Sequence, residues 1–343
     1  MRLINGGTTM PGFKSHYLFG RNALNNITPD KYEQYLIRFP QSYHLGLQGP
    51  DVFFYYLPAW LFYKKNIGNV IHKGKTNDFF KALISARNHF IKKESRLIAD
   101  SYISGFIAHY TLDSTVHPYI YHRTKYMEHD DKKLYDFGIH VFLETDIDNA
   151  LLRHYSHMKP SEFRMGDTIL LTVKEHIVIS ILLYEAIRKT FPDNKILLLH
   201  IRHAIGAMAL EANLMKDPKG IKKFFVRLLE RFVIGHAVIS PMIPNDKVTR
   251  YSDPCNLRHK KWFNPWDKSK ESCKSVYDLI DSATKTFEER LHYYSKSQTL
   301  SRDLTSEDKD ANLKNLLDSL NNCSYDSGLP YILNQESSRR NFS

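Results

Sequence analysis

The sequence predicts an all-α protein, a multi-helix bundle joined by long loops. Apolar residues recur three and four positions apart through residues 77–95, 97–122 and 133–156, and this spacing gives a helix an apolar face. No run of alternating apolar and polar residues, the pattern of a half-buried strand, separates these segments. Because such helices bury their apolar faces against one another, a bundle is the simplest architecture.

Each helix has its own signal along the chain. Residues 97–122 form a long, mostly apolar segment whose interior contains Gly105 and no further breaker before Pro118. Pro192 and Pro218 separate later periodic segments. We therefore expect further helices at about residues 172–191, 195–215, 219–235 and 275–294.

The chain turns polar from about residue 297. One amphipathic helix is expected at 306–321, because four leucines between 313 and 320 share a face. Thr305 and Asp308 have the spacing of a capping box at its start. We expect the tail after Cys323 to be poorly ordered. The predicted organisation is a helical domain at 1–296 and a polar, partly disordered extension at 297–343.

Length and composition indicate a globular protein. The 343 residues are 42% hydrophobic, enough for one large domain or two modest ones. The longest apolar stretch, 169–187, is interrupted by Lys174, Glu175 and His176, which indicates a buried helix rather than a membrane span. The start of the chain has no apolar signal segment, and the three cysteines show no CxxC spacing. We expect a cytoplasmic location by default, with unconventional export as the alternative.

The charge balance is basic, with a net charge of +11 and a pI near 9.3. Such a balance favours anionic partners: phospholipid head groups, other phosphodiesters or nucleic acid. The charges are spread along the chain, so a solvated surface explains most of them. Peripheral membrane contact is compatible with this pattern, and no obligate protein partner is predicted.

Histidines are numerous and concentrated in the first part of the chain. Of 17 histidines, nine fall between residues 16 and 140. His109, Asp113 and His117 are spaced four apart, so a helix stacks them in one column, with Cβ atoms roughly 5–6 Å apart. The flanking residues are apolar, and a buried carboxylate there needs partners. Metal ions would satisfy all three side chains, and a hydrogen-bonded network without metal is the alternative.

A second pair, His140 and Glu144, repeats the four-residue spacing on the next predicted helix, with Asp148 one turn later. Alone, this spacing is common by chance. The pair is flanked by apolar residues, and zinc takes both imidazole and carboxylate ligands. Two such helices close together in sequence therefore favour a zinc site.

Three upstream residues are ordinary when taken singly: His16 suggests a surface histidine, Asp51 a turn or cap, and His72 a loop. Together, however, five segments in order resemble the bacterial zinc-dependent phospholipase C family: PGFKSHYLFG, LGLQGPDVFFY, IHKGKTNDFF, GFIAHYTLDSTVHPYIY and HVFLETDID. The resemblance covers about residues 10–150 strongly and extends loosely to about 290. A similar ligand order occurs in zinc-dependent single-strand nucleases and in the phospholipase D that releases glycolipid-anchored proteins.

The resemblance implies the helical fold of that family, two or three zinc ions, and hydrolysis of phospholipids by a metal-activated water. It implies that one zinc is held by Asp51, His72, His109 and Asp113. It further implies that Asp113 bridges to a second zinc shared with His16. A separate group, His117, His140 and Glu144, would hold another ion. Asp51 or Glu144 would position or deprotonate the attacking water.

Two features depart from the secreted family members. Those members use the amino group of a mature N-terminal Trp as a ligand, and no Trp occurs near the start here. Translation from Met10 would bring an amino group nearer to His16. The spacing from Asp113 to His117 is also shorter, similar to that of the glycolipid-anchor phospholipase. His117 stays on the same helix face, and His122 is its rival as a ligand.

Two other functions are compatible with the same residues. A single-strand nuclease fits the basic charge, but the sequence has no basic run interleaved with stacking aromatics. A catalytically inactive metal-binding protein is the second alternative. The aromatic segment 53–63 and the tryptophans Trp262 and Trp266 suggest core packing first and a lipid-contacting wall second. His200, His203 and His236 lack acidic neighbours at helical spacing and are expected to be core or surface histidines.

Overall fold

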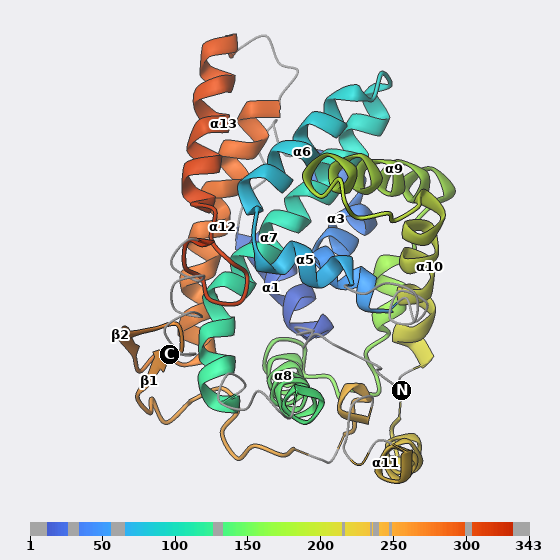
Figure 1. Cartoon of the computed structure of the whole chain (residues 1–343), viewed down its shortest axis with the longest axis vertical. Helices are drawn as coiled ribbons and strands as arrows, with labels where there is room; N and C mark the ends of the chain where they lie inside the picture. Colours follow the sequence, from blue (N-terminus) through green and yellow to red (C-terminus); the bar gives the residue numbers. More distant parts are fainter. Residues whose placement is uncertain are drawn as a thin grey trace.

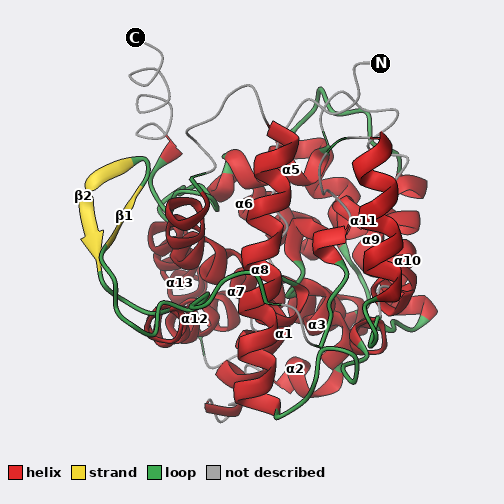
Figure 2. Cartoon of the chain, turned by 90° about the horizontal axis from the view of Figure 1, so that it is seen from below, coloured by secondary structure: helices red, strands yellow, loops and turns green. Residues whose placement is uncertain are grey.

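The computed structural model is almost entirely helical (Figures 1 and 2), and the predicted all-α fold is confirmed. It describes residues 12–26, 34–55, 66–125, 133–214, 217–233, 235, 240–246, 249–298 and 304–331. Of these, the side chains of 133–137 are not described. In the described part, no helix is long and apolar enough to cross a membrane.

The elements follow in chain order as α1 (Phe13–Asn26), α2 (Gln34–Arg38), α3 (Pro40–Gly46), η1 (Gly49–Tyr55), α5 (Ile67–Lys73), α6 (Thr76–His89), α7 (Lys93–Thr124), α8 (Lys133–Ser156), η3 (Met165–Ile169), α9 (Val173–Thr190), α10 (Leu198–Leu214), α11 (Ile221–Val233), η4 (Ser240–Met242), β1 (Trp262–Asn264), β2 (Asp267–Ser272), α12 (Val276–Gln298) and α13 (Ser306–Leu320). The predicted helices are confirmed to within four residues at each end, except that the helix predicted at 77–95 ends at His89 and residues 93–95 belong to α7. Helices α1, α2, α3 and α5 were not predicted. Helix α9 starts after the expected apolar stretch has begun, because Thr172 and Glu175 form a capping box there.

Helix α7 is the centre of the bundle. Its 32 residues span about 48 Å, and α1, α3, α8, α9 and α12 all pack against it (Figure 1). Because neighbours surround it, most of its residues are buried rather than one face alone. The histidine and carboxylate column of this helix therefore lies inside the protein.

Gly105 has a packing role in this central helix. A Cβ at Gly105 would lie 2.2 Å from the carbonyl oxygen of Tyr43, and one at Gly46 would lie 2.1 Å from that of Tyr102. Helices α3 and α7 thus touch backbone to backbone. This close approach brings the turn after α3, with Gly49 and Asp51, against the face of α7 that carries His109.

The small hairpin β1–β2 was not expected from the sequence. Its strands pair antiparallel at one edge of the molecule (Figure 2), and β2 is almost wholly polar. Strand β1 has three residues, too few to show an alternating pattern. The hairpin packs on α7 and does not change the fold class.

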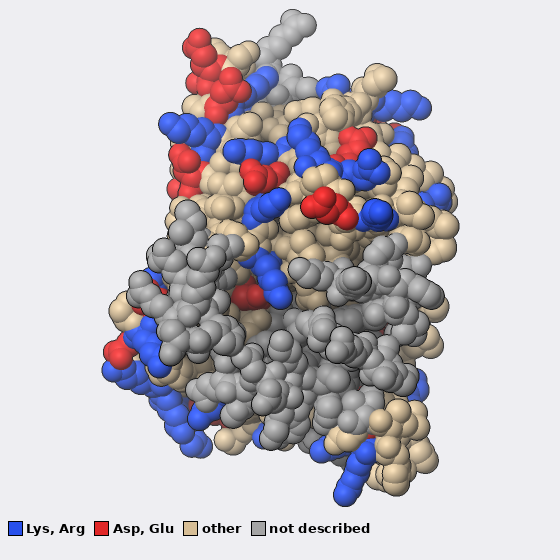
Figure 3. Space-filling view, viewed as in Figure 1, with Lys and Arg blue, Asp and Glu red and all other residues tan. Residues whose placement is uncertain are grey.

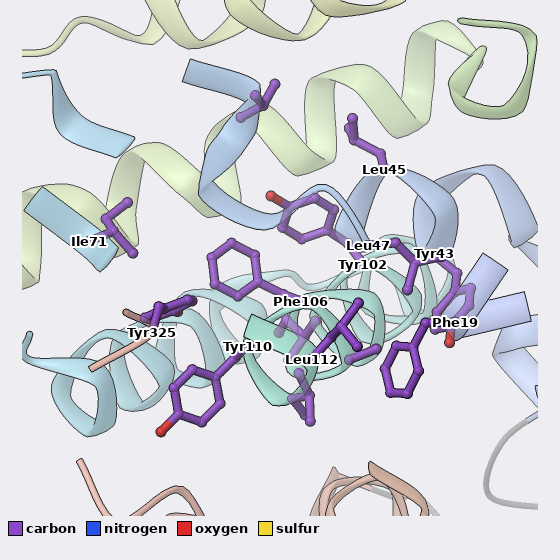
Figure 4. Packing of buried hydrophobic residues seen from close by; sticks show 14 of the residues in the cluster. Phe19, Tyr43, Leu45, Leu47, Ile71, Tyr102, Phe106, Tyr110, Leu112 and Tyr325 are labelled. Atoms are coloured by element: carbon purple, nitrogen blue, oxygen red, sulfur yellow. The ribbon is translucent and has the colours of Figure 1, made fainter. Parts of the chain in front are cut away.

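The end of the described chain packs into the core. The capping box of Thr305 and Asp308 starts α13 as predicted, and Leu316 and Leu320 are buried. The expectation of a poorly ordered tail does not hold for residues 324–331. Tyr325 is fully buried, and Figure 4 shows it beside Tyr110 among the core side chains. The domain boundary near residue 296 stays a prediction.

Pro118 helps to seat this final segment on α7. A proline has no N–H to donate to the carbonyl four residues earlier, so the carbonyl of Ser114 stays open. Gly328, with φ of +61°, lies directly against that carbonyl; a Cβ there would be 2.2 Å from the oxygen. The segment can approach this closely because residue 328 is a glycine.

Candidate metal centre

All eight side chains predicted as metal ligands lie in one buried cluster. Each is at most 3% exposed, and together they come from α1, η1, α5, α7 and α8. The members are His16, Asp51, His72, His109, Asp113, His117, His140 and Glu144. Three groups of these residues have donor atoms within 4.8 Å of one another: His16 with Asp51 and His109, His72 with His109 and Asp113, and His117 with His140 and Glu144.

Asp113 lies at the middle of the cluster. Its Oδ1 is 3.1 Å from Nε2 of His16 and 3.7 Å from Nε2 of His117. Its Oδ2 is 3.0 Å from Nε2 of His109 and 3.5 Å from Nε2 of His72. Each carboxylate oxygen therefore faces a different pair of imidazoles, which is the arrangement of a carboxylate that bridges two cations.

The other two carboxylates lie on either side of Asp113. Oδ1 of Asp51 is 3.3 Å from Nε2 of His72. Oε1 of Glu144 is 2.7 Å from Nε2 of His140 and 3.7 Å from Nε2 of His117. The three carboxylates are thus spread among the imidazoles, two of which, those of His16 and His109, stack with ring centroids 4.2 Å apart.

The local structure fixes which nitrogen of three histidines faces the cluster. Nδ1 of His72 donates to the carbonyl of Gly68 (2.8 Å), and Nδ1 of His109 donates to the carbonyl of Leu47 (3.1 Å). Nδ1 of His117 donates to the carbonyl of Tyr325 (3.1 Å). With a proton on Nδ1, each ring turns its Nε2 toward the carboxylates. Burial alone would lower the pKa of His72, but Asp113 and Asp51 raise it well above its usual value. Metal-binding histidines are oriented in this way by their outer hydrogen bond.

These buried groups fit a cation better than a network without metal. Among the described residues, Nε2 of His72, His109 and His117 makes no hydrogen bond of normal geometry, and neither do Oδ2 of Asp113 and both oxygens of Glu144. A neutral imidazole nitrogen gains nothing from a carboxylate oxygen that it faces, and a protonated one must release its proton before it can bind a metal. A divalent cation between them satisfies both, and zinc accepts this nitrogen and oxygen donor set.

The protonation equilibria follow from burial and from this mutual proximity. Burial alone would raise the pKa of Asp113, but His109, His117 and His16 outweigh it and hold that pKa well below its usual value. Burial raises the pKa of Glu144 well above its usual value. Burial also lowers the pKa of His140 to about 3, so its imidazole is neutral and able to act as a ligand at neutral pH.

Asp148 lies outside the cluster and supports it from the side. Its carboxylate accepts hydrogen bonds from the backbone N–H groups of Lys14 (3.1 Å) and Ser15 (2.8 Å), at the start of α1. Nζ of Lys14 donates to Asn149 (2.9 Å). These contacts join α1 to α8 and thereby set the position of His16.

The rival and secondary candidates lie elsewhere. The ring of His122 contacts Phe263 of the hairpin, with ring centroids 4.4 Å apart. His200 and His203 lie at least partly exposed on α10, and His236 is outside the described residues. Trp262 packs on Tyr119 and Trp266 on Tyr121, as core packing predicts. Of the aromatic segment 53–63, the described residues 53–55 are buried and the rest lies outside the described part.

Sequence reasoning missed two residues beside the cluster, Tyr325 and Asp326. The Tyr325 ring lies 5.0 Å from that of His72 and 6.0 Å from that of His109, and its backbone N–H donates to the carbonyl of His72. Oδ1 of Asp326 is 3.9 Å from Nδ1 of His117. No sequence signal marked them, because the polar tail has neither helical spacing nor a ligand motif.

Two pockets reach the cluster from different sides. One is a small cavity of about 30 Å³ with an apolar lining that includes Leu112, Val116 and Ile120 beside Asp113 and His117. The other is a cavity of about 40 Å³ lined by Glu144, Val141, Met165, Met242 and Pro244. The cluster is therefore bordered by apolar space as well as by ligands.

A helical bundle with a buried centre of five imidazoles and three carboxylates fits a zinc-binding protein. Residues 15–214 match the family model described as zinc dependent phospholipase C. The match covers more than half of the chain and all eight clustered residues, and the chain belongs to this family. No curated protein and no solved structure matches it. The family acts on phospholipid substrates.

Proposed function

We propose that the protein is a zinc-dependent phosphodiesterase that hydrolyses phospholipids to a diacylglycerol and a phosphorylated head group. The observation that carries the proposal is Asp113, whose two oxygens face two different pairs of imidazoles at 3.0–3.7 Å. A bridging carboxylate in a cluster of this kind is what two-metal phosphodiester hydrolysis requires.

We assign the ligands as three overlapping sets. Asp51, His72, His109 and Asp113 would hold one zinc, and Asp113 with His16 a second. His117, His140 and Glu144 would hold the remaining ion, and their donor atoms already lie within 4.8 Å of one another. When bound, zinc would lower the pKa of water toward about 7 and offset the charge on the phosphate oxygens.

The chain's own residues supply orientation and proton transfer. Both oxygens of Asp51 and of Glu144 lack a hydrogen-bond partner among the described residues, so each carboxylate has a free oxygen to accept a proton from water. The backbone carbonyls of Gly68 and Leu47 hold His72 and His109 in the ligand tautomer. Burial of the whole cluster excludes bulk water and strengthens each of these interactions.

The decisive experiment pairs zinc stoichiometry with hydrolysis of phosphatidylcholine, on protein purified without chelator. Asp113→Asn should abolish hydrolysis and lower the zinc content while the circular dichroism spectrum stays unchanged. Asp310→Asn, at an exposed position of α13, is the matched control and should behave as the parent protein. Full hydrolysis by Asp113→Asn would rule out the bridging role.

Two alternatives are tested by the same samples. A single-strand nuclease of this fold would cleave single-stranded DNA faster than phosphatidylcholine in a side-by-side assay. A metal-binding protein without turnover would contain zinc and cleave no phosphodiester. The family match favours the lipid, whereas a polynucleotide needs stacking aromatics with basic neighbours, a pattern that the sequence does not show.

A further inference from the structure

Helix α11 exposes its apolar face and buries two of its polar side chains. Its apolar side chains point away from the protein, whereas a surface helix normally turns them inward. Seven of them are between 41% and 81% exposed: Ile221, Phe224, Phe225, Leu228, Leu229, Phe232 and Val233. Contiguous apolar surface of this kind marks a binding site more often than a monomer's free surface.

The orientation of α11 is fixed by its polar residues, which point inward. Nζ of Lys223 donates to the carbonyl of Ile243 (3.1 Å) and lies over the Phe142 ring. The carboxylate of Glu230 accepts a hydrogen bond from the backbone N–H of Ser240 (3.1 Å). Both side chains are at least 93% buried. A rotation that buried the apolar face would break these buried contacts and expose their partners.

Basic residues border the outward apolar face. With about 100° between successive residues, Arg227 and Arg231 lie on one flank of the apolar stripe, and Lys222 lies near its other edge, between Leu229 and Val233. All three are exposed, and Lys219 precedes the helix. The one acidic residue of the helix, Glu230, is buried. In Figure 3 the corresponding corner of the molecule is tan with blue side chains around it.

The exposed apolar face and the basic residues beside it together fit an anionic bilayer as the surface that α11 binds. An interfacial helix inserts an apolar face among the acyl chains while basic residues at its flanks contact anionic head groups. A second copy of the chain is disfavoured, because a two-fold contact through this face would bring its basic flanks together. A helix of this length, with the apolar face outward and the basic residues at its rim, matches the bilayer.

The position of α11 connects this surface to the metal centre. Phe142, under Lys223, lies on α8 between His140 and Glu144. Helix α11 also packs on η4, whose Met242 lines the pocket that reaches Glu144. A bilayer held at α11 would therefore lie on the side of the protein where η4 and α8 border the cluster.

We propose that α11 is an interfacial helix that docks the protein on anionic phospholipid bilayers. The proposal rests on the phospholipid substrate proposed above and extends it to a surface outside the family-matched residues. Docking raises the local concentration of substrate at the pocket. It predicts binding to vesicles that depends on the apolar face and on the basic flanks separately.

The test measures sedimentation of the zinc-containing protein with vesicles of phosphatidylcholine, with and without 30% phosphatidylglycerol, with lipid integrity checked afterwards. The double variant Phe225→Glu/Phe232→Glu should bind at least tenfold more weakly. Arg227→Gln/Arg231→Gln should lose the preference for anionic vesicles. Ile91→Glu, at a 92% exposed site between α6 and α7, is the matched control and should bind as the parent does.

Hydrolysis of dispersed short-chain phosphatidylcholine separates this proposal from the proposed function. The Phe225→Glu/Phe232→Glu variant should keep that hydrolysis, because neither residue contacts the cluster. If the parent protein binds vesicles through α11 but hydrolyses no phospholipid, the docking role of α11 is supported and the proposed hydrolytic function is overturned. Unchanged vesicle binding in the Phe225→Glu/Phe232→Glu variant would overturn the docking role of α11. The same conclusion would follow if the parent protein were a dimer and the variant a monomer with unaltered vesicle binding.

Discussion

Replacing Tyr325 by alanine should weaken both the fold and zinc binding. Its ring is fully buried against the rings of Tyr110, His72 and His109. Removing a buried aromatic side chain costs roughly 3–5 kcal/mol of unfolding free energy. Because the Tyr325 backbone contacts both His72 and His117, loosening this segment should lower zinc affinity by about 10–100-fold, the usual effect of losing a group that orients ligands.

The two effects separate when unfolding is measured with and without zinc. Zinc that binds only the folded state adds stability that falls by about 1.4 kcal/mol for each tenfold loss of affinity. The Tyr325→Ala deficit measured by urea unfolding should therefore be about 1.4–2.7 kcal/mol larger in saturating zinc than in chelator. If Tyr325→Ala lowers the free energy of unfolding equally in zinc and in chelator, Tyr325 does not orient the ligands and its role is purely structural.

The matched control is Tyr325→Phe. Among the described residues, the Tyr325 hydroxyl is buried and has no hydrogen-bond partner, so its removal leaves no group unsatisfied. We expect zinc affinity and stability equal to or slightly above those of the parent. A large loss in Tyr325→Phe would mean that the hydroxyl itself contributes to the centre.

Three further outcomes follow. Chelation should lower the unfolding midpoint, and zinc but not Mg²⁺ should restore it, since five imidazoles suit zinc and Mg²⁺ prefers oxygen ligands. In the metal-free protein, His140 binds its proton more weakly than in the unfolded chain. Its contribution to the free energy of unfolding is therefore present above pH 6.5 and is lost as pH falls toward about 3. Between pH 7.5 and 5.5, urea unfolding should show a smaller drop in this free energy for His140→Gln than for the parent protein. Arg87→Met should lower the free energy of unfolding by about 3–5 kcal/mol in the same urea assay, because it leaves the buried carboxylate of Asp100 uncompensated, and it should not change the zinc content. Lys261→Met, which breaks an exposed ion pair, should leave the urea midpoint unaltered.

The helices and the clustered residues could be predicted from the sequence because each has a local signal. Four-residue spacing is a property of one helix, so the column of His109, Asp113 and His117 was visible before any tertiary contact. His16, Asp51 and His72 have no such spacing and were found only through the resemblance of their segments to a family. The four-residue spacing and the family resemblance together therefore identified all eight residues of the cluster.

The residues that were missed depend on contacts between distant segments. Tyr325 follows α13 in a polar stretch, and its ring is buried against those of Tyr110, His72 and His109, which lie more than 200 residues earlier in the chain. The spacing of α11 predicted a helix correctly, but not that its apolar face points outward. That orientation depends on Lys223 and Glu230 finding partners near η4.

The arrangement of the centre explains why ligands from five elements can share one cluster. The contact of Gly46 with Gly105 brings η1 onto α7, and the contacts of Asp148 bring α1 onto α8. Each junction sets the position of one ligand relative to the column on α7. A side chain at Gly105 would therefore force α3 away from α7 and move Asp51 from His72. Gly105→Ala should lower zinc content more than a destabilising substitution elsewhere in the core, such as Leu316→Ala, does at equal loss of stability.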